Sequence, residues 1–312
     1  MIEKYIKEKQ NIWNQFLLQS KNGTFLFCRN YMDYHQNRFE DYSLFIYRKD
    51  KPYSLLPAHR VYNTLYSHQG LTYGGFIMNN KVSAKGMLDI VEETISYLLS
   101  QGINEIVYKP IPFMYHIYPA QEDLYAFYKH SEIQIIGCTI SSVIFQNQNK
   151  LKYDHSRKGG LHKAIRLGLK ITESDNFEVF WNILINNLET NHRTKPVHTI
   201  DEIRLLKSRF PENIKLYLVQ KGELFLGGTL LYISRQVVHA QYASASPEGK
   251  ESGALDLLFD YLINEKYTDY PYFDFGHSNE QMGNYLNEQL IFQKEGFGGR
   301  GVINNTYKMI LK

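Results

Sequence analysis

The chain has 312 residues, of which 43% are hydrophobic and 21% charged, a composition typical of globular proteins. No apolar run is long enough to cross a bilayer, the first residues resemble no secretory signal, and two cysteines build no disulfide framework. We therefore expect a cytoplasmic protein without membrane insertion. Because single cores stop growing near roughly 250–300 residues, we expect two domains, at 1–150 and 151–312.

A net charge of +3 is too small to indicate a nucleic-acid-binding protein by itself. One stretch is locally basic, between residues 152 and 170, and its cationic side chains are Lys152, Arg157, Lys158, Lys163, Arg166 and Lys170. Two interpretations stay open. The stretch is either the solvated face of a helix or a binding edge for the phosphates of a cofactor, an activated substrate or RNA.

The first half alternates helices and strands. Apolar spacing predicts helices over 3–19, 84–100 and 122–130, and β-rich segments over 104–109 and 133–146. Residues 43–61 read as a hairpin around the turn RKDKP, and a glycine-rich strand end and loop follows at 67–78.

In the second half, helical spacing recurs within the basic stretch, over 176–190, and in DEIRLLKSRF after the N-cap residue Thr199. A hairpin of IKLYLV and LFLGGTLLYIS follows, and then the strand QVVHAQYASAS. We expect PEGKESG to be a loop that opens a helix at about 253–265. A strand at YFDFG and a glycine-rich tail, KEGFGGRG, precede a last strand near 302–311.

The two halves repeat one order of elements: a hairpin, a helix opened by a glycine, and a strand. The helices begin with similar residues, GMLDI from Gly86 and GALDL from Gly253. A repeated α/β unit indicates duplication. In the second copy, Gly249 to Gly253 with Lys250 could receive a phosphate at a helix N-terminus, and an ordinary strand-to-helix connection is the alternative.

Four segments resemble the FemAB-like branch of the GNAT N-acyltransferases, particularly the tandem GNAT proteins of bacterial cell-surface polysaccharide gene sets. The segments are SHQGLTYGGF at 67–76, the stretch 195–219, the stretch 227–258, and FDFGHSNEQMGNYLNEQLIFQKEGFGGRGV at 273–302. The ending, with a lysine before Phe-Gly, is similar to the lysine-bearing motif of the Fem transferases. Two features depart from the pattern. Leu255 replaces the second small residue of the GNAT pyrophosphate signature, and the helical arm of some Fem enzymes has no counterpart.

The resemblance implies an α/β protein of two tandem acyl-CoA N-acyltransferase (GNAT-like) domains, of which the second is catalytic and the first lies on the acceptor side. It implies transfer of an acyl group from acyl-CoA, in the first place acetyl-CoA, to the amine of an amino sugar, a sugar nucleotide or a similar cell-envelope precursor. One alternative is a Fem-type transfer from aminoacyl-tRNA, which the basic stretch favours. Another is a non-catalytic carbohydrate- or nucleotide-binding module. The sequence gives no indication of oligomeric state.

Direct acyl transfer needs a base for the amine proton and donors for the oxyanion. Asp274 and His277 end a predicted strand, where α/β sheets place ligands, and we take them as catalytic candidates. A turn-capping aspartate and a surface histidine are the alternative. The Fem motif adds Lys294 as a third catalytic candidate, and a solvated lysine is its alternative.

Further candidates concern the cofactor and the acceptor. For the cofactor we name Gly249, Lys250 and Gly253, Arg300 beside the GFGG turn, and Tyr242 on the strand that holds the thioester arm in GNAT enzymes. For the acceptor we name His68, Tyr73, His192 and His198, each of which also fits an ordinary loop or core position. The histidines lack the spacing of zinc ligands, so we expect no metal.

Overall fold

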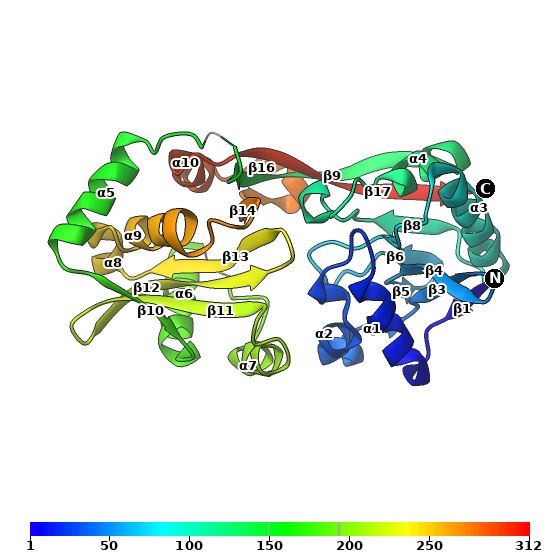
Figure 1. Ribbon diagram of the computed structural model, residues 1–312, viewed down its shortest axis with the longest axis horizontal. Coiled ribbons are helices and arrows are strands. Elements are labelled where there is room, and N and C mark those ends of the chain that lie inside the picture. The colour runs from blue at the N-terminus through cyan, green and yellow to red at the C-terminus, as the bar shows by residue number, and fades with distance from the viewer. Residues whose placement is uncertain (149, 193) are drawn as a thin grey trace. The chain divides into compact units, whose positions relative to one another are not determined.

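The computed structural model describes residues 1–148, 150–192 and 194–312, except the side chains of residues 191 and 192. The chain forms two compact units (Figure 1). Unit 1 comprises Met1–Thr139, Gln281–Tyr285 and Ile303–Lys312, and unit 2 comprises Ile140–Glu280 and Leu286–Val302. Two long strands, β9 (Ser131–Phe145) and β17 (Arg300–Leu311), therefore contribute residues to both units.

Unit 1 contains a four-stranded sheet and a second set of paired strands. The sheet has the order β1 (Ile2–Lys4), β3 (Leu44–Arg48), β4 (Lys51–Leu56) and β7 (Ile77–Met78). The second set has the order β17, β8 (Glu105–Tyr108), β6 (Thr64–Tyr66), β5 (His59–Val61) and β2 (Glu40–Asp41), with β6 and β8 parallel. Its main helices are α1 (Gln10–Leu18), the short α2 (Arg29–Met32), α3 (Ala84–Ser100) and α4 (Glu122–His130).

The expected helix over 3–19 begins later than predicted, because the chain start is a strand. Residues Ile2–Lys4 pair with β3, and α1 covers only Gln10–Leu18 after a short 3₁₀ turn. By contrast, α3 has the predicted limits. The Ser83 hydroxyl caps its start by accepting from the Gly86 N–H, and its buried side chains recur at helical spacing.

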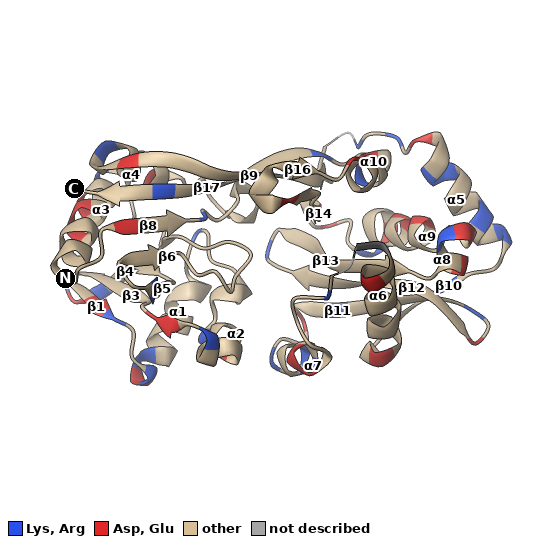
Figure 2. Ribbon diagram, turned by 180° about the vertical axis from the view of Figure 1, so that it is seen from behind, with Lys and Arg blue, Asp and Glu red and all other residues tan. Residues whose placement is uncertain are grey.

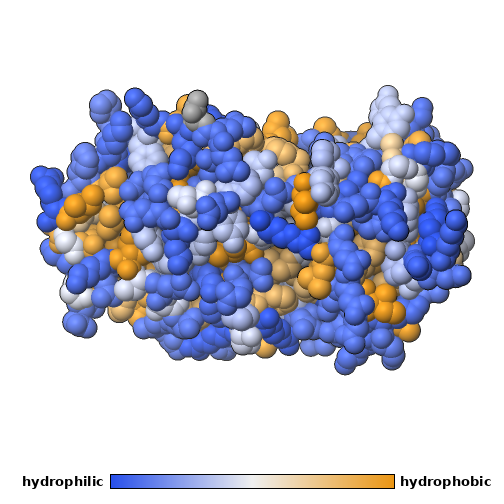
Figure 3. All heavy atoms as spheres, viewed as in Figure 1, coloured by the Kyte–Doolittle hydropathy of each residue, from blue (hydrophilic) through white to orange (hydrophobic). Residues whose placement is uncertain are grey.

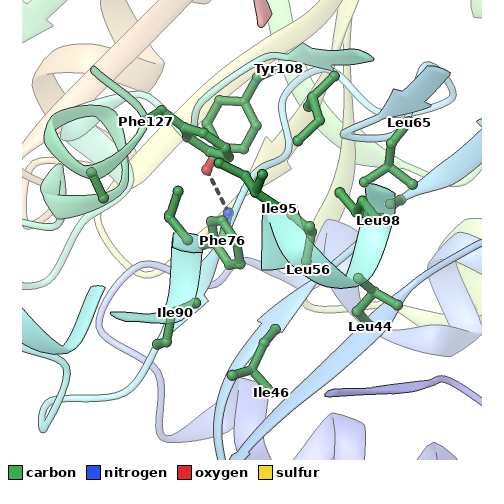
Figure 4. Close-up of a cluster of buried hydrophobic side chains, with 14 of the residues drawn as sticks. Leu44, Ile46, Leu56, Leu65, Phe76, Ile90, Ile95, Leu98, Tyr108 and Phe127 are labelled. Carbon is green, nitrogen blue, oxygen red and sulfur yellow. Dashed lines mark hydrogen bonds between the residues drawn. The ribbon is translucent and has the colours of Figure 1, made fainter. Parts of the chain in front are cut away.

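The core of unit 1 packs α3 and α4 against both sets of strands (Figure 4). Phe76, Tyr108 and Phe127 form its aromatic centre. The Tyr108 hydroxyl accepts a 2.8 Å hydrogen bond from the Phe76 N–H and donates to the Asp123 carboxylate. Burial raises the pKa of Asp123 to about 6, although the hydrogen bond from Tyr108 lowers this pKa. The one acid in this core is thus paired, as a buried polar group requires.

Unit 2 is built on an antiparallel sheet that contains one parallel pair. Its strands follow in the order β10 (Lys170–Ser174), β11 (Ile214–Lys221), β12 (Leu224–Ile233), β13 (Val237–Ala245), β14 (Tyr272–His277) and β9. Its helices are α5 (His155–Arg166), α6 (Phe177–His192), α7 (Ile200–Arg209), α8 (Pro247–Ser252), α9 (Ala254–Tyr261) and α10 (Glu288–Gly296). The parallel pair is β13 and β14, and α8 and α9 connect these two strands.

The segment PEGKESG forms α8, so its prediction as a loop was wrong. The signals of a short helix are all present: Ser246 is the N-cap, Pro247 is the first helical residue, and Gly253 ends the helix in the left-handed conformation at φ +77°. The Thr199 cap was predicted correctly. Thr199 and Glu202 form a reciprocal capping box at the start of α7.

Lys and Arg residues gather along α5, where the basic stretch was noted (Figure 2). Lys158, Lys163 and Arg166 are exposed, whereas Arg157 turns inward and pairs with Asp256 of α9 at 2.7 Å. The described residues include no helix that is long and apolar enough to cross a membrane. Hydrophilic residues cover most of the face in Figure 3, and apolar residues form limited patches on it.

Candidate active site

Strands β13 and β14 separate in the middle of unit 2. Their parallel pairing begins at Val237 with Tyr272 and ends at His239 with Asp274. Beyond this point β13 continues to Ala245 and, within the described part of the chain, pairs with β12 alone, and His277 of β14 pairs with Ser141 of β9. One edge of the β13 backbone therefore lies without a strand partner among the described residues, and such an edge can bind an extended ligand.

A β-bulge sets which side chains of β13 share a face. The register with β12 shifts between Leu230 and Leu231, so that Gln241 is the extra residue. Val238 and Ala240 pack in the core with α9, which places His239 on the opposite face. Past the bulge, Tyr242 contacts Trp181 of α6, at 5.5 Å between ring centroids. His239 and Tyr242 thus lie on the face that α6 covers.

The partly buried His239 and the buried Asp274 form a pair at the point of separation. The Nδ1 atom of His239 lies 2.8 Å from Oδ2 of Asp274, and Oδ1 of Asp274 accepts a 2.8 Å hydrogen bond from the Gly276 N–H. Burial alone raises the pKa of Asp274, but His239, the Gly276 N–H and nearby Lys294 outweigh it and hold this pKa below its usual value. The carboxyl group is therefore ionised at neutral pH.

Lys294 lies in the last turn of α10 and is only 9% exposed. Its ammonium donates to the carbonyls of Gly276, at 2.9 Å, and His277, at 2.8 Å. Burial lowers the pKa of Lys294 to about 8, with Asp274 acting in the opposite sense. Lys294 thereby anchors the turn that follows Asp274. The side chain of His277 is exposed at this turn.

Two residues predicted for different ligands are close together. Nδ1 of His198 and the Tyr242 hydroxyl are 2.8 Å apart. Burial raises the pKa of Tyr242, and hydrogen bonds from the His198 and Val197 backbone and from Gln241 reduce the shift. The tyrosine is neutral and can donate a hydrogen bond. The side chain of His192 lies outside the described residues.

The predicted phosphate cradle is closely packed. A Cβ on Gly249 would lie 1.9 Å from the Leu226 carbonyl oxygen, and a Cβ on Gly253 would lie 2.2 Å from that of Gly160. Both glycines therefore have a packing role. Lys250 donates to Asn187 of α6 at 2.6 Å, and Arg300 donates to the carbonyl of Gly299 at 2.6 Å. Lys250 and Arg300 therefore bind different acceptors, Asn187 and the Gly299 carbonyl.

The two acceptor candidates of unit 1 lie in different surroundings. His68, at φ +72°, borders a cavity of about 150 Å³ together with His35, Phe39 and Arg29. Burial lowers the pKa of His68 to about 2, with further contributions from His59, His35 and Arg29. Tyr73 is not among the residues that line this cavity, and its hydroxyl donates to Thr24 at 3.2 Å.

Sequence reasoning missed His239, the partner of Asp274. The strand that contains it, QVVHAQY, was predicted. Strand alternation alone places the side chains of His239 and the apolar Val238 on opposite faces of the sheet. What the sequence did not contain was the register that sets β13 beside β14, since this pairing joins residues 35 positions apart. No group of three or more His, Cys, Asp or Glu side chains in the described part of the chain is arranged to hold a metal ion.

Comparisons with known proteins place this geometry in context. The acetyltransferase (GNAT) domain family matches residues 153–285. The structure is similar to that of FemX, with a TM-score of 0.70 at 11% identity over 100% of this chain and 97% of that chain. L-PGS from Bacillus licheniformis aligns with a TM-score of 0.59 at 12% identity, over 99% of this chain and 93% of that one.

A tandem GNAT protein from the clavulanic acid biosynthesis pathway aligns with a TM-score of 0.51 at 8% identity, over 100% of this chain and 98% of that one. At such identities these likenesses establish the fold alone. Comparison with curated protein sequences finds no match.

Proposed function

We propose that the chain, which has a mixed α/β fold of tandem GNAT type and matches the acetyltransferase (GNAT) domain family over residues 153–285, is a FemAB-like acyltransferase that transfers an acyl group from acyl-CoA to an amine of an amino sugar or a similar cell-envelope precursor. The observation that carries the proposal is the separation of β13 from β14 beyond His239 and Asp274. It leaves a backbone edge in unit 2 along which an extended acyl arm can bind.

The polar groups at this point suit acyl transfer. An amine must lose a proton as it attacks, and the developing oxyanion needs donors. In the proposal, Asp274 of β14 organises the group that accepts the amine proton, and the neutral Tyr242 hydroxyl of β13 contacts the acyl arm. Lys294 fixes the turn at Gly276, and His277 borders the acceptor. His68 and Tyr73 of unit 1 keep their proposed place on the acceptor side.

A second donor, aminoacyl-tRNA, is favoured by the first turn of α8. Pro247 has no N–H, the Ser246 hydroxyl already accepts from the Gly249 N–H, and Glu248 adds a negative charge. Little remains there to bind the pyrophosphate of CoA. The exposed cations of α5 offer RNA phosphates a separate binding face (Figure 2).

Donor binding distinguishes these candidates. Saturating acetyl-CoA is expected to increase the free energy of unfolding by about 2–3 kcal/mol, as a specific ligand at a large excess over its Kd does. The double substitution Lys158→Ala and Lys163→Ala should leave this increase unchanged, because both side chains belong to the exposed face of α5. Chemical denaturation with and without ligand measures it.

The aminoacyl-tRNA candidate predicts a different pattern. Charged tRNA should bind with a steep salt dependence, and the double variant should lower the slope by roughly one unit for each lysine that binds a phosphate in the wild type. Binding of tRNA without any response to acyl-CoA would replace the first donor by the second. Binding of a sugar nucleotide alone, with no response to either donor, would indicate a non-catalytic module and contradict the proposed transfer.

A further inference from the structure

His239 has the surroundings of a catalytic base. We propose that His239 removes the proton from the acceptor amine, and that Asp274, Gly276 and Lys294 are positioning residues that hold its ring. The inference rests on the proposed acyl transfer and assigns the proton-accepting step to one atom, Nε2 of His239.

The hydrogen bonds of Asp274 define the tautomer of His239. Oδ1 of the ionised carboxylate already accepts from the Gly276 N–H, and Oδ2 faces Nδ1 of the imidazole at 2.8 Å. A carboxylate can only accept, so Nδ1 carries a hydrogen, and in the neutral imidazole Nε2 is the nitrogen with the lone pair. Nε2 makes no hydrogen bond to any residue that the structure describes, and the side chain keeps 14% of its surface exposed. The basic nitrogen is thus formed and accessible.

The ring is also held from its edge. Gly276 has φ +73°, and a Cβ at this position would lie 3.1 Å from Cε1 of His239, so the backbone passes close to the imidazole. The Lys294 ammonium fixes the same turn through the carbonyls of residues 276 and 277. A base held by two elements loses little orientational freedom when the substrate binds.

The position of His239 matches the step that it would serve. It is the last residue of β13 that pairs with β14, so an acyl arm along the free edge of β13 would begin beside its ring. The amine nitrogen forms a bond to the acyl carbon and passes its proton to Nε2. The bond from that carbon to the thioester sulfur breaks, or, if the donor is an aminoacyl ester, the bond to the ribose oxygen. The proton then leaves Nε2 for the departing thiolate, or for the ribose oxygen if the donor is an aminoacyl ester, so charge and protons balance.

A structural role is the competing explanation, because the pair also ties two strands together. The His239→Asn variant distinguishes the structural role from the role as a base. The asparagine amide can still donate to Asp274, but it has no second ring nitrogen that could accept a proton. We expect His239→Asn to retain donor-induced stabilisation and to lose at least about 100-fold in turnover, the lower end of general-base contributions. His130→Asn, a substitution on α4 of unit 1, is the matched control and should keep wild-type turnover.

Two further readouts complete the experiment. In His239→Gly, added imidazole should restore part of the turnover, which a purely structural role would not allow. In ¹⁵N-histidine-labelled wild type at neutral pH, the His239 ring should be protonated at Nδ1 and not at Nε2. Equal turnover of wild type and His239→Asn, or a proton on Nε2, would overturn the role of His239 alone. A wild type inactive with both acetyl-CoA and aminoacyl-tRNA would contradict the proposed function, and the base role with it.

Discussion

The Asp274→Asn variant is expected to fold and to lose about 10³-fold in turnover, the largest functional effect that the site predicts. The oxygen of the new amide would continue to accept from the Gly276 N–H, so its NH₂ group would point at Nδ1 of His239. Nδ1 would then have to accept, and the hydrogen would move to Nε2. The imidazole would keep its place and lose its function as a base.

Single-turnover rates with saturating donor measure this effect without interference from product release. Asp269→Asn is the matched control, because Asp269 is an exposed aspartate of the same unit. It should be indistinguishable from wild type in rate and in donor-induced stabilisation. A rate for Asp274→Asn within about fivefold of wild type, against the 10²–10⁴-fold typical of a general base, would show that the carboxylate does not set the tautomer of the base.

The Gly253→Ala variant is expected to lose about 3 kcal/mol of unfolding free energy. Gly253 has φ +77°, which costs an alanine of the order of 1 kcal/mol or more. The added Cβ would also lie 2.2 Å from the Gly160 carbonyl oxygen, and backbone of a packed helix cannot yield without moving α5 from α9. Chemical denaturation followed by fluorescence measures the loss.

In the Gly159→Ala variant, by contrast, we expect the free energy of unfolding to increase. An added Cβ at Gly159 would meet nothing within 4 Å, so this substitution should stabilise α5 by about 0.5–1 kcal/mol through the higher helix propensity of alanine. If both variants were equally stable, the close approach of α5 to the α8–α9 junction would be refuted.

Local signals in the sequence explain most of the elements. The limits of α3 follow from the Ser83 cap and its apolar spacing, and the start of α7 follows from its capping box. The PEGKESG segment was misread as a loop although Ser246, Pro247 and Gly253 are the signals of a short helix. Gly249 has no positive φ, and only the tertiary structure reveals the Leu226 carbonyl against it.

Candidate site residues could be predicted from the sequence only where the signal is local. Asp274 was recognisable at a strand end, and Lys294 through its resemblance to the Fem motif. The hydrogen bonds that give them a chemical role join β13, β14 and α10, whose register is set by tertiary packing. This explains why His239 was missed although its strand was predicted, and why His198 and Tyr242 were assigned to different ligands although they form one hydrogen-bonded pair.

Product analysis would test directly whether unit 2 transfers an acyl group to an amine. The purified full chain would be incubated with acetyl-CoA or aminoacyl-tRNA and a panel of amino sugars and sugar nucleotides, and products would be identified by mass spectrometry. We expect an N-acylated amine and an equal amount of released thiol or uncharged tRNA, both reduced about 10³-fold by Asp274→Asn. Release of the donor's leaving group without an acylated amine, or equal product yields from wild type and Asp274→Asn, would contradict this expectation.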